Sequence, residues 1–267
     1  MFITIFKGGA MAETAQQNNN AQSRINSVLK ENRRFVPPES FSRNAHIRSA
    51  EELAEISARA AENPMAFWEA RAREIDWFEP WHTALEWEYP HAKWFVGGKL
   101  NISYNCLDRH LVKNGDKTAF IWEGEPGEIK KLSYRELHAE VCRLANALKK
   151  LGVKMGDVVG IYMGMNPEAA IAMLACARIG ATHNVVFGGF SAEALHERMM
   201  DSKAVCIITQ NAAQRRGETI LLKPAVDEAL MHTPNVKNVV VFKRTDIETS
   251  MQTGRDHWWH ELLKSEP

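Results

Sequence analysis

The sequence has 267 residues, enough for one large domain or for a domain with a cap. Lys plus Arg and Asp plus Glu both number 33, so no net charge attracts the chain to nucleic acid or to an anionic membrane. The four cysteines form no CxxC pair and no apolar run approaches the ~18 residues of a membrane span, which disfavours zinc modules, disulfide frameworks and transmembrane proteins.

Residues 1–35 are predicted to be a disordered leader. The run AETAQQNNNAQSR after Met11 is polar, rich in Asn and Gln, and has no apolar periodicity. Met1 and Met11 are both candidate starts. The apolar residues before Met11 are too few to form the hydrophobic region of a secretory signal. We therefore expect the folded chain to begin near Pro37-Pro38.

Residues 36–103 are expected to form an irregular, tryptophan-rich helical cap. Two short helices are predicted, Ser49–Glu62 and Pro64–Asp76. Five of the eight tryptophans fall between Trp68 and Trp94. These rings could be a stacking platform for nucleotides, but the neighbouring Glu and Asp residues would repel phosphate. We favour the alternative that the rings pack the segment onto a larger domain.

Residues 104–267 carry strands and helices in regular alternation from Thr118 onward. Such alternation is typical of a parallel, doubly wound α/β sheet with right-handed crossovers. Helix starts are marked by the capping box of Ser133 and Glu136, by Asn166-Pro167 and by Ser191. The predicted elements are a hairpin of 118–123 with 129–132, strands 158–162, 184–187, 205–209 and 236–242, and helices 133–151, 166–179, one from 191 and one over about 223–231.

The usual nucleotide and hydrolase motifs are absent from the sequence. Gly160 and Gly164 after the predicted strand do not form G-x-G-x-x-G, and no G-x-x-x-x-G-K-[ST] occurs. No serine lies in a G-x-S-x-G turn. Dinucleotide-binding, Walker-type and α/β-hydrolase enzymes are therefore disfavoured.

The turn Phe187-Gly188-Gly189 is the first candidate for ligand contact. It joins a strand end to a helix start, where glycines let a ligand approach the backbone and the helix N-terminus favours an anion. In open α/β sheets, ligands bind outside the carboxyl ends of the strands, which is where this turn lies. An equally good interpretation is a tight turn in which Ser191 is an ordinary N-cap.

The second candidate is Arg215-Arg216-Gly217-Glu218, directly after the predicted strand 205–209. Adjacent guanidinium groups beside a glycine suit phosphate, although most arginine pairs are solvated surface. His257 and His260 could share a helix face as metal ligands. Without a third ligand they indicate a packing segment instead, and we predict neither a metal site nor a catalytic residue.

The sequence resembles the acetyl-CoA synthetases, the AMP-forming acetate–CoA ligases, over most of the chain beyond the leader. Propionate ligases are a close second. The resemblance lies in FW at Phe67, DWFEPW from Asp76, KWFVGGKLNISYNCLDRH from Lys93, VVFGGFSAEAL from Val185, LLKPAVDEAL from Leu221 and DHWWHEL from Asp256.

This resemblance implies a fold, substrates and a compartment. Residues 104–267 would be the first part of the adenylate-forming ligase domain, a partial doubly wound sheet. The family's complete enzymes join acetate and ATP into acetyl-adenylate with Mg²⁺ and pass the acetyl group to coenzyme A. The resemblance implies a cytoplasmic protein whose partners are these small molecules and a carboxy-terminal portion beyond Pro267.

The resemblance also assigns coenzyme A-binding residues. By this resemblance, the surface that contacts the adenosine end of coenzyme A is formed by Phe187, Gly188 and Gly189. The stretch that binds the phosphates of coenzyme A is Arg215, Arg216, Gly217 and Glu218. The family commonly has a basic residue at the position of Glu218. No catalytic or metal residue is carried over, because the adenylation motifs correspond to positions beyond Pro267.

Two functions are therefore expected as alternatives. The first is an amino-terminal fragment of an acetate–CoA ligase that holds part of the coenzyme A site and is inactive alone. The second is a non-catalytic binding or regulatory module that associates with a complete ligase or with its missing half.

Overall fold

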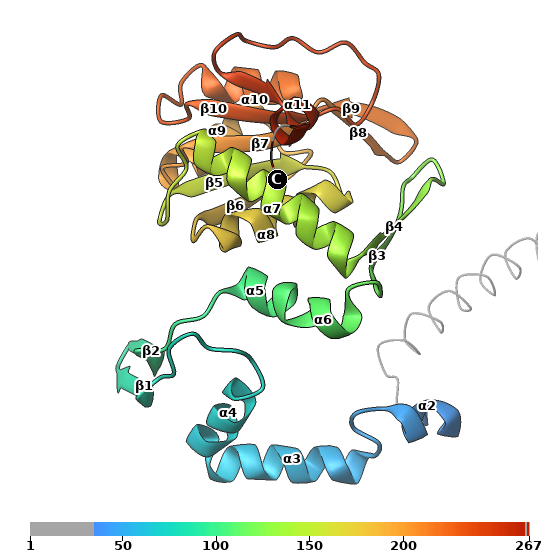
Figure 1. Cartoon of the computed structure of the whole chain (residues 1–267), viewed down its shortest axis with the longest axis vertical. Coiled ribbons are helices and arrows are strands. Elements are labelled where there is room, and N and C mark those ends of the chain that lie inside the picture. The colour runs from blue at the N-terminus through green and yellow to red at the C-terminus, as the bar shows by residue number, and fades with distance from the viewer. Residues whose placement is uncertain (1–34, 265, 267) are drawn as a thin grey trace, which may run out of the picture. The chain divides into compact units, whose positions relative to one another are not determined.

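The structure is a computed structural model that describes residues 35–264 and 266 (Figure 1). The predicted leader therefore lies outside the described residues, apart from Phe35. The chain divides into two compact units, Met1–Pro64 and Met65–Pro267. In the first unit the structure describes helices α2 (Glu39–Asn44) and α3 (Ala50–Glu62).

Helix α3 confirms the first predicted helix of the cap segment. The side chain of Ser49 accepts a hydrogen bond from the backbone N–H of Glu52 at 3.1 Å, which satisfies one of the free amides at the helix start. The helix ends at Glu62, before Asn63 and Pro64. None of its residues is buried.

The second unit begins with α4 (Pro64–Ala72) and a β-hairpin that the sequence analysis missed. Strands β1 (Thr83–Glu88) and β2 (His91–Val96) pair antiparallel, so the cap contains a hairpin in addition to the helices that we expected. Helix α4 ends four residues earlier than predicted, where the indole N–H of Trp77 donates to the carbonyl of Ala72 at 2.8 Å.

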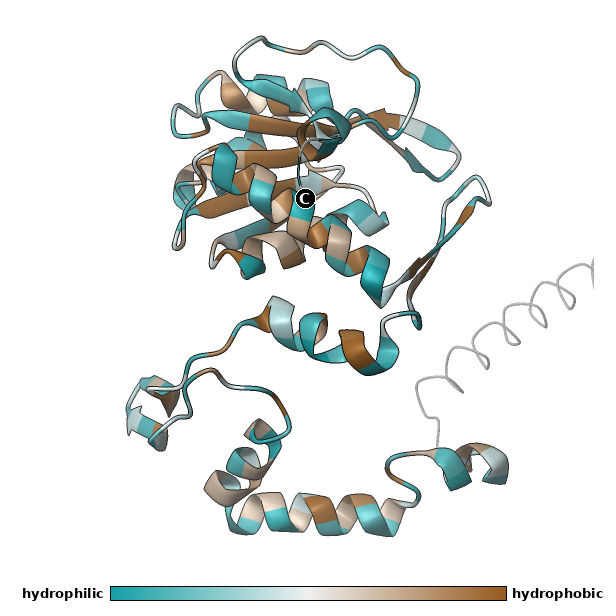
Figure 2. Cartoon of the chain, in the orientation of Figure 1, coloured by the Kyte–Doolittle hydropathy of each residue, from teal (hydrophilic) through white to brown (hydrophobic). Residues whose placement is uncertain are grey.

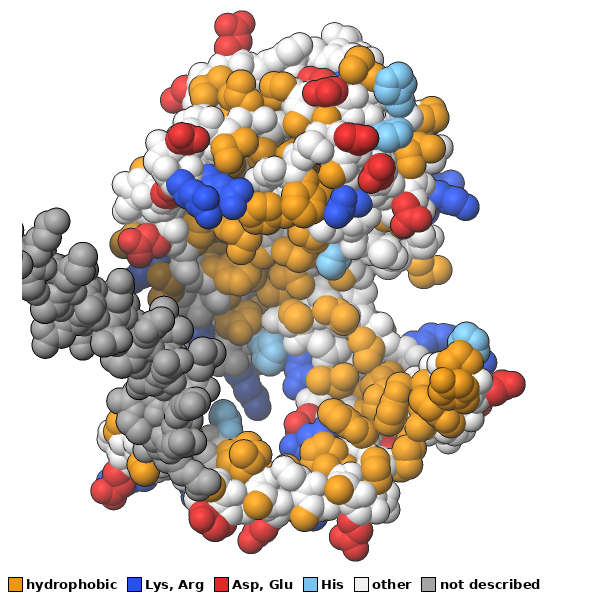
Figure 3. All heavy atoms as spheres, turned by 180° about the vertical axis from the view of Figure 1, so that it is seen from behind, with side chains coloured by type: hydrophobic (Ala, Val, Ile, Leu, Met, Phe, Trp, Pro, Cys, Tyr) orange, Lys and Arg blue, Asp and Glu red, His pale blue; other side chains and the backbone are white. Residues whose placement is uncertain are grey.

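The tryptophans of this segment divide into a packed and an exposed group. Trp77, Trp81 and Phe95 form one cluster with ring centroids 5.0–5.6 Å apart. Trp68, Trp87 and Trp94 are 49%, 65% and 45% exposed. Figure 3 shows hydrophobic side chains gathered on the surface of this hairpin. The packing interpretation is therefore wrong for the second group.

Asn101 links this segment to the α/β part of the same unit. Its side-chain oxygen caps α5 (Ile102–Cys106) by accepting from Tyr104 N, and its side-chain N–H donates to Ala177 O at 2.9 Å. Asp108, in the 3-10 turn Asp108–His110, accepts two hydrogen bonds of 2.7 Å from Arg178. The short helix α6 (Leu111–Asn114) follows.

The α/β part is a five-stranded parallel sheet in the order β11-β10-β7-β5-β6, which confirms the predicted fold class. The hairpins β3–β4 and β8–β9 form separate two-stranded sheets. The elements are β3 (Thr118–Glu123), β4 (Ile129–Ser133), α7 (Tyr134–Lys150), β5 (Val158–Met163), α8 (Pro167–Arg178), β6 (Thr182–Phe187), α9 (Ala192–Asp201), β7 (Cys206–Gln210), β8 (Ala212–Arg215), β9 (Glu218–Leu221), α10 (Lys223–Leu230), β10 (Asn238–Phe242), β11 (Asp256–Trp258) and α11 (Trp259–Lys264).

Helices cover both faces of the sheet, as the doubly wound pattern predicts. Leu144 of α7 and Ile171 of α8 lie in one buried cluster, and Leu195 of α9 and Val226 of α10 lie in the other. The central strand β5 is apolar along its whole length and β7 is fully buried, as expected for strands covered on both faces (Figure 2). The edge strand β6 begins with the polar run Thr182-His183-Asn184 and is mostly exposed. The predicted capping box is present, with Ser133 and Glu136 each accepting from the other's backbone N–H.

The rejected alternative for His257 and His260, a shared helix face, does not occur, because His257 lies in β11 and His260 in α11. His257 contacts the side chain of Asn238 at 3.0 Å, and Trp259 between the two histidines is buried. Of the four cysteines, Cys106 is exposed, Cys142 is partly buried, and Cys176 and Cys206 are buried. Burial raises the pKa of the Cys176 thiol to about 12.

Between residues 35 and 266, with the masked position excluded, no three His, Cys, Asp or Glu side chains are grouped to hold a metal ion. None of the helices that the structure describes is long and apolar enough to cross a membrane.

A buried charge network joins α10 to Arg255 and to Asp256, the first residue of β11. The side chain of Lys223 is 1% exposed and lies 2.7 Å from both the Asp227 and the Asp256 carboxylates, the latter fully buried. Arg255 pairs with the same two carboxylates. Burial alone would raise the pKa of Asp256, but hydrogen bonds from Arg255 and Lys223 outweigh it and lower that pKa. The contribution of the ionised Asp256 carboxylate to the free energy of unfolding is therefore complete above the unfolded-state pKa of ~3.9. It is lost as the pH falls through the lower folded-state pKa.

We expect Lys223→Met to destabilise the chain by about 3 kcal/mol, because removing one partner leaves the buried Asp256 carboxylate undercompensated. Urea unfolding followed by tryptophan fluorescence measures the change. Lys243→Met is the control, since Lys243 is half exposed and pairs with the exposed Asp246; it should cost about 0.5 kcal/mol or less. Equal losses for the two variants would contradict a stabilising role for the network.

Candidate functional site

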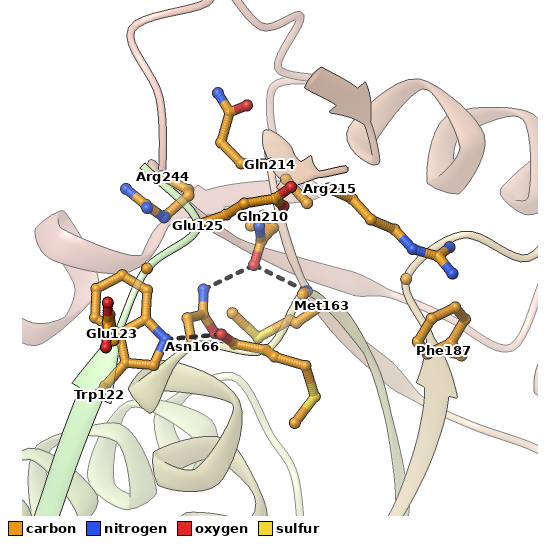
Figure 4. A pocket seen from close by; sticks show the side chains of 15 residues that line it. Trp122, Glu123, Glu125, Met163, Asn166, Phe187, Gln210, Gln214, Arg215 and Arg244 are labelled. Carbon is orange, nitrogen blue, oxygen red and sulfur yellow. Dashed lines mark hydrogen bonds between the residues drawn. The ribbon is translucent and has the colours of Figure 1, made fainter. Parts of the chain in front are cut away.

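A cavity of about 350 Å³ lies at the carboxyl ends of β5, β6 and β7 (Figure 4). The connection from β5 runs through α8 to β6, whereas the connection from β7 runs through α10 to β10 on the other face. The loops after β5 and β7 therefore diverge, which opens a crevice between them. This is where open α/β sheets bind ligands.

Gln210 holds the floor of this cavity together. Its side-chain oxygen accepts from the backbone N–H of Gly164 at 3.1 Å and from the amide of Asn166 at 2.8 Å. Its side-chain N–H donates to Ala212 O at 2.7 Å. One buried amide thus joins the end of β7 to the end of β5, to the N-cap of α8 and to the start of β8.

The turn Phe187-Gly188-Gly189 forms one wall. Gly188 is buried, and a Cβ atom there would lie 2.6 Å from the carbonyl oxygen of Met163, so the turn approaches β5 too closely for any other residue. The Arg215 guanidinium lies 4.7 Å from the centre of the Phe187 ring. The two sequence-predicted stretches therefore meet, through Phe187, Gly189 and Arg215.

The second predicted stretch is a hairpin turn, which the sequence analysis did not recognise. Arg215 pairs with Glu218 across β8 and β9, and Arg216 and Gly217 form the two-residue turn with φ of 54° and 77°. Positive φ at both central residues is the mark of a tight hairpin turn, and the glycine was its signal in the sequence. Arg216, Gly217 and Glu218 are exposed and do not line the cavity.

The β3–β4 hairpin supplies the opposite wall, which the sequence analysis did not connect with the site. The Trp122 indole N–H donates to Met165 O at 2.8 Å, and Glu125 accepts from Gly217 N at 2.7 Å. Arg244 pairs with Glu128 and lies 5.3 Å from the Trp122 ring. These contacts hold the hairpin against the carboxyl edge of the sheet.

The chemistry of the lining suits binding. The cavity is lined by two arginines, two glutamates, three amide side chains and the rings of Trp122 and Phe187. The described residues that line it include no serine, cysteine, histidine or lysine. The arrangement can stack a planar group and hold an anion, and the side chains that line it include no nucleophile other than the two glutamates.

Gly188→Ala should destabilise the chain by about 1–3 kcal/mol, because a new methyl group meets fixed backbone of β5. Gly189→Ala is the matched control. Its Cβ would lie 3.0 Å from the Arg215 guanidinium, a flexible side-chain end that can move away. Thermal unfolding of both variants measures the difference. A Gly188→Ala variant as stable as Gly189→Ala would contradict the close approach of this turn to Met163.

Two family models match the chain in sequence. Residues 53–106 match the acetyl-coenzyme A synthetase N-terminus, and residues 107–266 match the AMP-binding enzymes. The acetyl-coenzyme A synthetase of Chlorobaculum tepidum is 51% identical over 94% of this chain and 38% of its own length. That of Rubrobacter xylanophilus is 50% identical over 87% of this chain and 36% of its own length.

The fold comparison agrees with these matches. The solved structure of acetoacetyl-CoA synthetase from Streptomyces lividans superposes with a TM-score of 0.74 at 24% identity, over 86% of this chain and 35% of that one. This confirms the fold that the resemblance implied. The chain spans about 38% of the length of the Chlorobaculum relative. The sequence matches, above all the one over residues 107–266, show that the chain belongs to the AMP-binding enzyme family.

Proposed function

We propose that this chain is the amino-terminal portion of an AMP-forming acetate–CoA ligase and that it contributes part of the coenzyme A site. The observation that carries the proposal is the contact between Phe187 and Arg215, which joins two distant stretches at the crevice edge of the sheet. Its family membership and its identity to acetyl-coenzyme A synthetases support acetate as the acid. The chain's four free cysteines accord with a cytoplasmic location.

The residues present fit a coenzyme A nucleotide in several respects. The Gly188-Gly189 turn lets a ligand approach the backbone, the Phe187 ring offers a stacking surface, and the Arg215 guanidinium offers a phosphate partner. In our proposal these groups bind and orient the nucleotide end. We assign no residue of this chain to ATP or Mg²⁺, and the described residues contain no acidic cluster for a metal.

The second candidate function is a non-catalytic module that binds a complete ligase or its missing half. The exposed rings of Trp68, Trp87 and Trp94 favour it, since gathered exposed apolar groups are typical of protein interaction surfaces. The adjoining genomic sequence separates the two proposals: a downstream frame with the phosphate loop supports the ligase portion, and its absence supports the module.

Arg215→Ala should weaken coenzyme A binding and Glu218→Lys should strengthen it, each a few-fold, because exposed ion pairs contribute only ~0.2–1 kcal/mol. Isothermal titration calorimetry measures both affinities. Glu228→Lys, the same charge change on an exposed residue of α10 outside the cavity, is the control. If Glu218→Lys binds no better than the parent, the phosphates do not lie at the β8–β9 turn.

The 267 residues alone should not catalyse acetate-dependent exchange of pyrophosphate into ATP. The sequence lacks a glycine-rich phosphate loop, so the triphosphate has no cradle. A radiolabel exchange assay on protein purified from a host without its own ligase measures this. Exchange above that of a mock purification would refute the proposal that the chain is inactive alone.

A further inference from the structure

One hydrogen bond joins two loops that are far apart in the sequence. The carboxylate of Glu125, in the loop between β3 and β4, accepts from the backbone N–H of Gly217, in the turn between β8 and β9, at 2.7 Å. Figure 4 shows the Glu125 side chain reaching across the cavity toward the strand that carries Gln214 and Arg215. The Glu125 carboxylate therefore occupies a hydrogen-bond donor, Gly217 N–H, in the turn that we propose to bind phosphate.

The β8–β9 turn is equipped to hold an anion. The N–H of Gly217 is free of the strand ladder, because Arg215 and Glu218 are the last paired residues of the hairpin. Two arginines precede it, and neither has a carboxylate within 4.0 Å in the part of the chain that the structure describes. A backbone N–H in a turn that follows two arginines favours a negatively charged ligand, and one of these arginines, Arg215, already lies over the Phe187 ring. The anion bound there in this structure is Glu125.

The loop that carries Glu125 is anchored independently of this bond. Gly124 N donates to Glu128 O at 2.7 Å and Gly127 N donates to Gly124 O at 2.8 Å, which fixes the loop backbone. Glu128 pairs with Arg244, and Trp122 donates to Met165 O. The Glu125 side chain is exposed. It can therefore leave Gly217 by side-chain rotation, without separation of the hairpin from the sheet.

We propose that Glu125 is a built-in competitor for the anion site at Gly217, and that a phosphate group of the bound nucleotide displaces its carboxylate. This rests on the proposed function, since it takes the coenzyme A nucleotide as the displacing ligand. Every anion that binds at the turn must first break the Glu125–Gly217 bond. A nucleotide that also stacks on Phe187 gains enough contact to do so, whereas a small anion such as pyrophosphate gains less.

The test compares Glu125→Ala with Glu123→Gln. Both variants remove one negative charge from the lining of the same cavity, but only Glu125 bonds to Gly217. Calorimetric titration with coenzyme A should give about threefold to tenfold tighter binding for Glu125→Ala, which is the range that an exposed charge-assisted hydrogen bond contributes. The affinity of Glu123→Gln should stay within about twofold of the parent. Circular dichroism confirms that both variants are folded.

Two ligand-independent readouts keep this test separate from the proposed function. Amide hydrogen exchange at Gly217 without ligand should be faster in Glu125→Ala than in the parent and unchanged in Glu123→Gln. Pyrophosphate titration should also favour Glu125→Ala. If coenzyme A binds to no variant but pyrophosphate still binds tighter to Glu125→Ala than to the parent, the proposed function is wrong and the competition by Glu125 is supported. If Glu125→Ala binds anions no more tightly than the parent, or if no variant binds an anion, the proposal that Glu125 competes for Gly217 is wrong.

Discussion

The carboxyl edge of the sheet depends on the side-chain amide of Gln210. Parallel strands end with backbone groups that their neighbours no longer satisfy, and the diverging loops after β5 and β7 leave such groups facing each other. Gln210 satisfies Gly164 N and Ala212 O and also holds the Asn166 amide. Because Asn166 caps α8 and Ala212 begins β8, one buried side chain sets the positions of a helix start and of the hairpin that carries Arg215.

The cavity walls follow from this arrangement. Gly188 lets the turn after β6 lie directly against β5, which brings the Phe187 ring to the Arg215 guanidinium. The β3–β4 hairpin closes the other side through Trp122, Glu125 and the Arg244–Glu128 pair. Residues from five separate stretches therefore meet at one edge, and the site has equal numbers of arginines and glutamates. Such a balance favours ligands that combine charge with a planar group over simple anions.

The elements that the sequence predicted well are those with local signals. The capping box at Ser133, the Asn166-Pro167 start and the apolar run of β5 each depend on neighbouring residues, and all are present. The missed elements depend on partners distant in the chain. Strand β11 is only three residues long and exists because it pairs with β10, and β1–β2 forms among exposed aromatic residues that suggested an irregular cap. For the site, the sequence identified Phe187 and Arg215 but not Trp122, Glu125 or Arg244, since nothing local shows that the β3–β4 hairpin lies over the sheet edge.

The buried position of Lys223 has a consequence for chemical labelling. Its ammonium group is enclosed by two carboxylates and the carbonyl oxygen of Ser250 at 3.1 Å, and its side chain is 1% exposed. An amine reacts with acyl donors and other amine-directed reagents only where these can reach it, and here the carboxylates and the carbonyl oxygen enclose it. The exposed lysines of the chain would be labelled rapidly in the folded state, while Lys223 would be labelled only when α10 separates from the segment before β11. Its labelling rate therefore reports the opening of that part of the fold directly.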